Sequence, residues 1–211
     1  MFNYPDKTNV NKQITLKELF KTFKYDKELK LNASSIDSIC LSNVLSKKTT
    51  NLNESENVKE IYIIDIVLKE NIVPTKFITA FNKNIALQTL FRTYFKDNVK
   101  YITSIKTFED EKINILQNFE SDWIQKLNNN FPNTTKLENV FKEIIKKVSG
   151  CKFKENETLN EFSHRFNQIK KLKSEILKLT KQVNAEKQPN LKMELNDNLK
   201  QLKKELLKKE D

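Results

Sequence analysis

The chain has 211 residues, and its 38 Lys and Arg against 28 Asp and Glu give a net charge of +10. This length supports one domain with a sizeable core, or one domain with an appendage. The basic residues are spread along the chain, and a nucleic-acid footprint requires clustering, so the charge favours solubility. No apolar run approaches the roughly 20 residues of a membrane span, and no signal peptide is recognisable, which predicts a cytoplasmic protein without a membrane segment.

The densest apolar run, Glu60–Leu68, predicts the central strand of a sheet. In extended form it places alternate residues on opposite faces, with Ile61, Ile63, Asp65 and Val67 on one and Tyr62, Ile64, Ile66 and Leu68 on the other. Both faces are largely apolar. We therefore expect other elements to cover the strand on both sides.

Four segments precede this strand. The polar residues 1–13 are expected to be loose. Thr15–Glu18 has the form of a capping box, so a helix is predicted from Thr15 to about Lys24. Ile36–Leu45 predicts a second, weaker strand, and the Ser-, Thr- and Asn-rich residues 47–57 predict a surface loop.

The residues after the central strand alternate between helical and extended patterns. The period-two alternation of Leu87–Phe95 and Val99–Phe108, separated by the turn residues Lys96–Asn98, predicts a hairpin. The other expected elements are a helix opened by Pro74 with the stripe Phe77, Ile78, Phe81 and Ile85, a short strand at Ile113–Phe119, and a packing anchor at Trp123.

A further helix is expected after the Asn-rich break at residues 128–133. Its apolar positions from Leu137 to Val148 fall at helical spacing, and Thr135–Glu138 has the form of a second capping box. Gly150, the single glycine of the chain, is expected to end this helix. A domain boundary is predicted at Cys151–Glu157, after an α+β domain of residues 1–150.

Residues 158–211 are predicted to form a helical tail. Thr158–Glu161 is a third capping box, and leucine and other apolar residues then recur every three or four positions, as in a coiled-coil seam. Pro189 interrupts the pattern, so we expect two helices, from Thr158 to about Lys187 and from Pro189 to Lys208. The predicted fold class is α+β, a mainly antiparallel sheet with flanking helices followed by a helical hairpin or coiled-coil tail.

Most catalytic motifs are missing from the sequence. A single glycine excludes the phosphate-binding loops and the nucleophile elbow, which need several. His164 is the only histidine and is interpreted as a polar-face residue of a helix. Cys40 and Cys151 lack metal-type spacing and are expected to be reduced, partly buried thiols. We therefore expect no catalytic residues, no metal site and no cofactor.

Asp65 is the one residue of the sheet that raises a question of chemistry. An ionised carboxylate on a central strand is costly unless it is paired, so Asp65 either meets a Lys, Arg or Thr or belongs to a site. A magnesium-dependent nuclease would place a Glu-x-Lys on a neighbouring strand. The only such sequence, Glu28–Lys30, precedes the sheet. A structural Asp65 is the preferred interpretation, and the nuclease stays as an alternative.

The tail also carries charge. From Thr158 onward it has 13 Lys and Arg against 8 acidic residues. One interpretation is the solvated flank of a coiled coil, and the other is a surface that contacts phosphates. The absence of interleaved aromatics and of a groove-reading motif favours the first.

The most specific residues of the chain lie in this tail. Glu186, Lys187, Gln188, Asn190, Lys192, Glu194, Leu195, Asn196, Leu202 and Leu206 resemble the C-terminal signature of the bacterial domain-of-unknown-function family 4391. The resemblance extends weakly over most of the chain, through the order of its elements. The sequence departs from the signature at Pro189, where the family usually has an aromatic residue.

This resemblance implies an α+β domain with a helical appendage and no established catalytic residues. Members of the family are often encoded beside helicases, DNA methyltransferases and other restriction or phage-defence genes. The resemblance therefore suggests a non-enzymatic accessory or adaptor subunit of a DNA-processing complex. The alternatives are direct binding of nucleic acid and a nuclease that uses Asp65.

The tail signature has a physical interpretation as well. Gln188, Asn190 and Asn196 are poor core residues, but in a helix pair such amides can hydrogen-bond across the interface and fix its register. We hypothesise that a partner chain docks on this segment through Glu186, Lys187, Gln188, Asn190, Lys192, Glu194 and Asn196. The partner would be a helicase or DNA methyltransferase, or a second copy of the chain.

Overall fold

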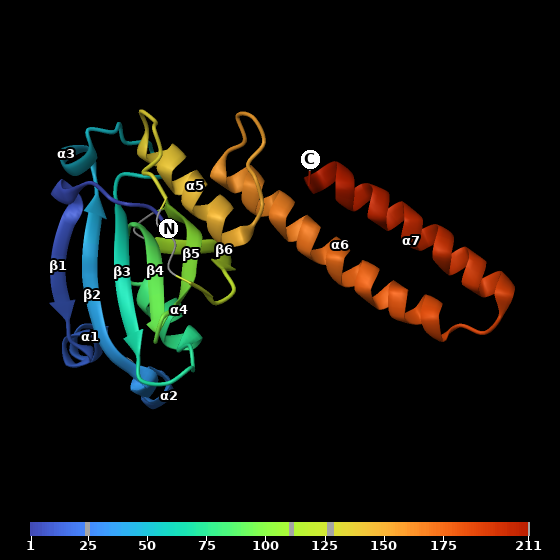
Figure 1. Ribbon diagram of the computed structural model, residues 1–211, viewed down its shortest axis with the longest axis horizontal. Coiled ribbons are helices and arrows are strands. Elements are labelled where there is room, and N and C mark those ends of the chain that lie inside the picture. The colour runs from blue at the N-terminus through green and yellow to red at the C-terminus, as the bar shows by residue number, and fades with distance from the viewer. Residues whose placement is uncertain (24–25, 110–111, 126–128, 211) are drawn as a thin grey trace. The chain divides into compact units, whose positions relative to one another are not determined.

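The computed structural model describes residues 1–23, 26–109, 112–125 and 129–210, with only the backbone of Glu109. The chain divides into two compact units, Met1–Gly150 and Cys151–Asp211 (Figure 1). The first holds a sheet and its helices, and the second holds two long helices that pack together. The predicted α+β fold class is confirmed.

The sheet is mixed but mainly antiparallel. Its described strands are β1 Asn9–Ile14, β2 Ile36–Leu45, β3 Ile61–Leu68, β4 Gln88–Phe95, β5 Asn98–Glu109, β6 Lys112–Glu120 and β7 Ile124–Gln125. The strands β1 to β6 lie in sequence order, and β7 pairs with β5. Only β3 and β4 run parallel. A parallel pair needs a crossover, and helix α4, Thr75–Asn82, supplies it.

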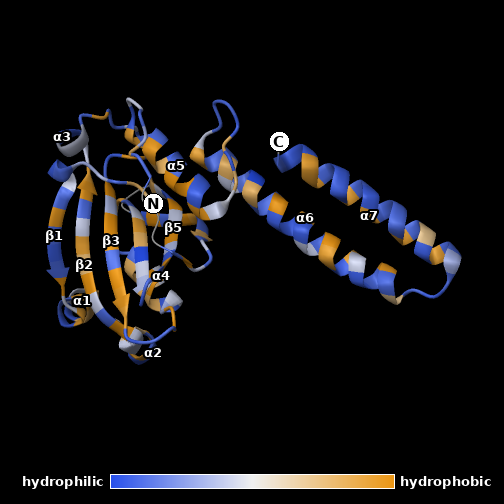
Figure 2. Cartoon of the chain, viewed as in Figure 1, coloured by the Kyte–Doolittle hydropathy of each residue, from blue (hydrophilic) through white to orange (hydrophobic). Residues whose placement is uncertain are grey.

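Strand β3 is central and covered on both faces, as predicted. On one face, Ile64, Ile66 and Leu68 belong to a core that includes residues of α1 Leu16–Phe23, α2 Lys27–Asn32 and α4. On the other face, Ile61 and Ile63 are fully buried. That side also holds α5, Leu137–Ser149, which packs against β5 and β6. The apolar residues of β3 stand out as orange bands in Figure 2.

Several local predictions are confirmed. The Thr15 hydroxyl accepts a hydrogen bond from Glu18 N–H, and Glu18 accepts one from Thr15 N–H, which completes the first capping box. The strands β4 and β5 form the predicted hairpin, with Lys96 at a positive φ of 52° in the turn. Gly150 ends α5 with a φ of 72°. Trp123 is half-buried against the core, and Cys40 and Cys151 are half-buried thiols.

Residues 1–13 are not loose, and that prediction was wrong. They contain a 3-10 turn, Asp6–Thr8, and the edge strand β1, which pairs with β2. The strand is polar and mostly exposed, so it has no apolar alternation of its own. Its position is fixed instead by backbone pairing and by Asn43, whose Nδ2 donates to Thr8 Oγ1 at 2.9 Å and to Asn9 Oδ1 at 2.8 Å.

Other local elements differ from the predictions. Thr135 does not cap α5, because Asn53 forms a bridge with Lys136, donating its N–H to Thr135 O and accepting from Leu137 N–H, so that Lys136 takes the N-cap position without a side-chain cap. Helix α2 was missed, although Asp26 caps it by accepting from Leu29 N–H at 2.8 Å. The loop expected at residues 47–57 contains a short helix, α3 Lys47–Thr50. Earlier in the chain, a 3-10 turn, Ala33–Ser35, leads into β2. The predicted helix end near Lys24 and the start of the Asn-rich break at residue 128 lie outside the described residues.

The second unit consists of α6, Leu159–Ala185, and α7, Pro189–Glu210. The Thr158 capping box is present, with Thr158 Oγ1 accepting from Glu161 N–H. Pro189 is the first residue of α7, where its missing N–H has no helical partner to lose. The tail is therefore two helices, as the proline predicted. None of the helices in the described part of the chain has the length and apolarity needed to cross a membrane.

Candidate functional site

The two helices of the second unit run side by side as a hairpin (Figure 1). Their buried and half-buried apolar residues recur every three or four positions, which is the seam of a helix pair: Ile169, Leu172, Ile176, Leu179, Val183, Leu195, Leu199, Leu202 and Leu206. Two helices bury such a seam only in part, and Ile176, Leu179 and Leu202 remain half-buried. The hairpin therefore has little interior of its own.

The seven sequence-predicted partner-binding residues lie at the closed end of this hairpin, here called the tip. Glu186 follows the last residue of α6, and its Oε1 accepts from Gln188 N–H at 2.8 Å. Lys187, Gln188, Asn190, Lys192 and Glu194 are exposed, and Glu186 and Asn196 are half-buried. The structure therefore brings all seven residues together around one helix–helix connection.

Within the chain, the described hydrogen bonds of Gln188 and Asn196 are local. Asn196 Nδ2 donates to Lys192 O at 2.9 Å, one turn earlier in its own helix. Gln188 uses its backbone, donating to Glu186 and accepting from Lys192 N–H. Neither bond joins α6 to α7, so the described contacts of these residues fix the turn and α7 itself.

A groove of about 540 Å³ opens at the tip. Its lining combines apolar and acidic groups: Gln182, Ala185, Glu186, Leu191, Glu194 and Leu195. Leu191 is 44% exposed, although it continues the leucine pattern of the seam. Two of the predicted residues, Glu186 and Glu194, line this groove. Nothing in the sequence indicates that Leu191 lies in a groove, because periodicity does not show where a helix pair stops covering its own leucines.

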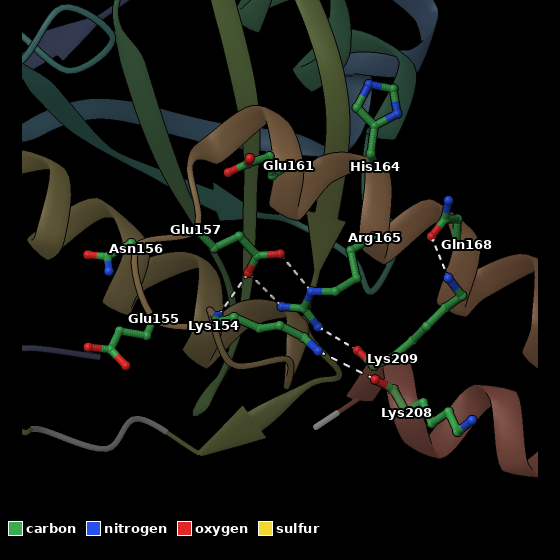
Figure 3. Close-up of a pocket in the computed structure, with 10 residues that line it drawn as sticks. All are labelled: Lys154, Glu155, Asn156, Glu157, Glu161, His164, Arg165, Gln168, Lys208 and Lys209. Carbon is green, nitrogen blue, oxygen red and sulfur yellow. Dashed lines mark hydrogen bonds and ion pairs between the residues drawn. The ribbon is translucent and has the colours of Figure 1, made fainter.

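The opposite end of the hairpin is held by a buried ion pair (Figure 3). Arg165 donates to both carboxylate oxygens of Glu157, from Nε at 2.6 Å and from a terminal nitrogen at 2.7 Å. The same guanidinium donates to Lys209 O at 2.8 Å, near the C-terminal end of α7. Burial alone would raise the pKa of Glu157, but the hydrogen bonds from Arg165 and Lys154 N–H outweigh it and lower the pKa. This cluster is a clamp, because its donors and acceptors are used within the chain.

His164 and three lysines surround the clamp and line an open pocket of about 620 Å³ (Figure 3). His164 is exposed on α6, as the sequence predicted for a polar-face residue. Lys209 Nζ donates to Gln168 Oε1 at 2.9 Å, and Lys154 Nζ reaches Lys208 O at 3.4 Å. The first contact joins α7 to α6, the second joins α7 to the segment before α6, and both add to the clamp.

Asp65 is paired, as its preferred interpretation required. Both of its carboxylate oxygens accept from Arg92, at 2.5 Å from Nε and 2.8 Å from a terminal nitrogen. Arg92 also donates to Ser42 Oγ at 3.0 Å and lies over the ring of Tyr4. Burial raises the pKa of Tyr4 well above its ordinary value. Because Arg92 uses both oxygens of Asp65, this carboxylate is a structural partner of the neighbouring strand.

Sequence analysis overlooked the most unusual titratable group of the sheet, Lys106. Its side chain is fully buried, and Nζ donates to Asn82 Oδ1 at 2.8 Å and to Ile85 O at 2.9 Å. Burial lowers the pKa of this lysine to about 7. Both acceptors lie at or just beyond the C-terminal end of α4, where carbonyls lack helical partners. Lys106 therefore ties the end of α4 to β5, and a lysine in an alternating strand gives no sequence signal of this role.

The described residues contain no group of three or more His, Cys, Asp or Glu side chains arranged to hold a metal ion. Neither the curated proteins nor the solved structures contain a match to the chain. One family model does match, over residues 2–206, and its description is "Domain of unknown function (DUF4391)". The match spans both units and includes the tip of the hairpin, in agreement with the resemblance seen in the tail. The chain belongs to this family.

Proposed function

We propose that the chain is a non-enzymatic adaptor subunit of the cytoplasm that binds a protein partner through the tip of its helical hairpin. The partner suggested by the family resemblance is a DNA-processing enzyme, such as a helicase or a DNA methyltransferase. One observation carries the proposal. Seven residues of the family signature, from Glu186 to Asn196, gather at the tip, beside a partly apolar groove that the chain itself does not cover.

The groove is suited to binding because it exposes apolar surface. Leu191 is 44% exposed on α7, and Leu195 beside it is half-buried. Full burial of a leucine side chain contributes roughly 1.5–3 kcal/mol. Because both leucines are already partly buried, a partner that covers the rest of them gains about 1–2 kcal/mol before any polar contact is counted. The clamp at the other end holds α7 against α6.

The signature residues also have little to do in the isolated hairpin. Five of the seven are exposed, and the described hydrogen bonds of Glu186 and Asn196 are local to the turn and to α7. The seam and the clamp hold the two helices together. Residue types that the fold does not require, placed on one exposed end, support a role in recognition.

Affinity purification from the native host tests the proposal. The full-length chain would be compared with Leu191→Ser, which removes apolar surface from the groove, and with Met193→Ser as a matched control. Met193 is 69% exposed on the same helix and does not line the groove. We expect a specific partner to be lost with Leu191→Ser and kept with Met193→Ser. Equal recovery with both variants, or recovery only of the chain itself, would refute an adaptor that works through the tip.

A second candidate function is direct binding of nucleic acid. It is favoured by the lysines on the outer faces of the hairpin, all of them exposed: Lys170, Lys171, Lys178, Lys181, Lys192, Lys200, Lys203 and Lys204. If these residues contact phosphates, the affinity for a DNA duplex should fall steeply with salt, with a slope set by the number of contacts. Weak binding without that slope would leave the lysines as the solvated flank of the helix pair.

The nuclease hypothesis draws no support from the geometry, because Arg92 already binds both oxygens of Asp65. A Mg²⁺-dependent cleavage assay with Asp65→Ala as control distinguishes it from the other two. Cleavage that depends on Asp65 would restore the hypothesis.

A further inference from the structure

The apolar and acidic residues that line the tip groove indicate which class of partner segment it binds. Resting on the adaptor function above, we propose that the groove takes a basic, leucine-bearing helical segment of the partner protein. The groove supplies an apolar floor for the leucine, and the carboxylates of Glu186 and Glu194 supply partners for flanking Lys or Arg side chains.

The floor of the groove comes from both helices. Ala185 lies at the end of α6, and Leu191 and Leu195 lie one turn apart near the start of α7. Side chains four residues apart lie on the same face of a helix, so the two leucines form a short ridge. The small Ala185 side chain leaves room opposite them. An apolar side chain of a partner can insert here and remove Leu191 from water.

The rim of the groove is acidic. Glu186 Oε1 accepts from Gln188 N–H, whereas Glu194 is exposed at the first turns of α7. Lys187 and Lys192 are close in sequence and exposed, but neither lines the groove. The groove is thus locally negative on a chain whose net charge is +10. Complementary charge between the groove and its ligand favours a basic partner segment.

The backbone of the tip favours a helix over an extended peptide. Strand addition requires a row of unpaired N–H and C=O groups. Here Glu186 N–H donates to Gln182 O, Gln188 N–H to Glu186 Oε1 and Lys192 N–H to Gln188 O. The groove therefore offers side chains and few backbone groups, which matches the binding of an amphipathic helix in a groove.

Photo-crosslinking identifies the bound segment directly. The full-length chain would carry p-benzoyl-phenylalanine in place of Leu191, or in place of Met193 as control, and be crosslinked in extract of the native host. We expect position 191 to crosslink to a peptide with net positive charge and at least one leucine, and position 193 not to do so. A crosslink from position 191 to an acidic segment, to nucleic acid, to a second copy of this chain, or to nothing would overturn the proposal.

Charge reversal tests the rim. Glu186→Lys with Glu194→Lys should reduce capture of the crosslinked partner by about tenfold or more. The matched control is Glu175→Lys with Glu205→Lys, two exposed glutamates on the same helices that do not line the groove. Equal losses in both double variants would overturn the acidic rim. If Leu191→Ser abolishes capture and the rim variant does not, the adaptor function stands and the basic segment is wrong.

Discussion

The fully buried Lys106 predicts a pH dependence of stability that can be measured. Burial lowers its pKa to about 7 from an ordinary value of 10.5. Between these two values the unfolded chain binds more protons than the folded chain. Lys106 therefore lowers the free energy of unfolding most below pH 7, and this free energy rises as the pH rises towards 10. Integrating this linkage from pH 6 to pH 9 gives a gain of about 2–3 kcal/mol in the free energy of unfolding.

The substitution Lys106→Met isolates this effect, because methionine has a similar length and does not titrate. The variant leaves Ile85 O without its ammonium donor, which costs about 1–3 kcal/mol. Removal of the buried charge offsets part of that cost below pH 7. We therefore expect the variant to be near wild type at pH 6 and less stable than wild type by an amount that grows up to pH 9.

Urea unfolding followed by tryptophan fluorescence measures this difference. Trp123 is the only tryptophan of the chain and packs against the core, so it reports on the first unit. Lys83→Met is the control, since Lys83 is exposed at the end of the same helix, α4. Burial raises the pKa of Tyr94 to about 12 and of Tyr101 above its ordinary value of 10. Tyrosines of the unfolded chain would therefore lose protons first, at about pH 10, and add a second pH dependence, so the measurement stays below pH 9.5. Parallel pH profiles for wild type and Lys106→Met would refute the reasoning.

Three further substitutions test single contacts. Asp65→Ala leaves the Arg92 guanidinium, only 15% exposed, without its carboxylate, and is expected to cost about 3 kcal/mol in the same urea assay; a loss below 1 kcal/mol would mean that Ser42 and water replace the pair. Gly150→Ala meets no atom within 4 Å, so only the positive φ is strained, and a thermal melt should show a loss of about 1 kcal/mol. Thr158→Ala removes the cap of α6 and should cost about 1 kcal/mol of hairpin stability by far-UV circular dichroism, whereas Thr158→Ser should cost less.

The parts of the fold that could be predicted are those whose own residues carry the signal. Strand β3 is apolar on both faces, and apolar and polar residues alternate in β4 and β5 on either side of a turn. The spacing of their apolar residues therefore predicts which of these strands' residues are buried. The three-four rhythm of α5 and the proline at position 189 are signals of the same local kind. In each case the residues that fix the element lie within it.

The parts that could not be predicted depend on contacts distant in sequence. Strand β1 exists because β2 offers it an edge, and the cap expected at Thr135 is displaced because Asn53 forms a bridge with Lys136. Lys106 is interpretable only once β5 places it against the end of α4. The tip groove is a further example. A leucine at seam spacing looks the same whether or not the partner helix still covers it, and Leu191 lies where coverage has ended.

The contrast between the two units is itself an argument about where binding occurs. In the first unit the central strand is covered on both faces. Asp65 on β3, Arg92 on β4 and Lys106 on β5 all bond to side chains or carbonyls of the same unit. In the second unit the buried charges, Glu157 and Arg165, serve only to fasten one end of a helix pair. The Arg165 contacts hold α6 and α7 together at one end of the hairpin, and the side chains at the other end, the tip, stay exposed to a partner. Leu191 is 44% exposed and lines the groove with Glu186 and Glu194, so the hairpin covers only part of this leucine and a partner can cover the rest.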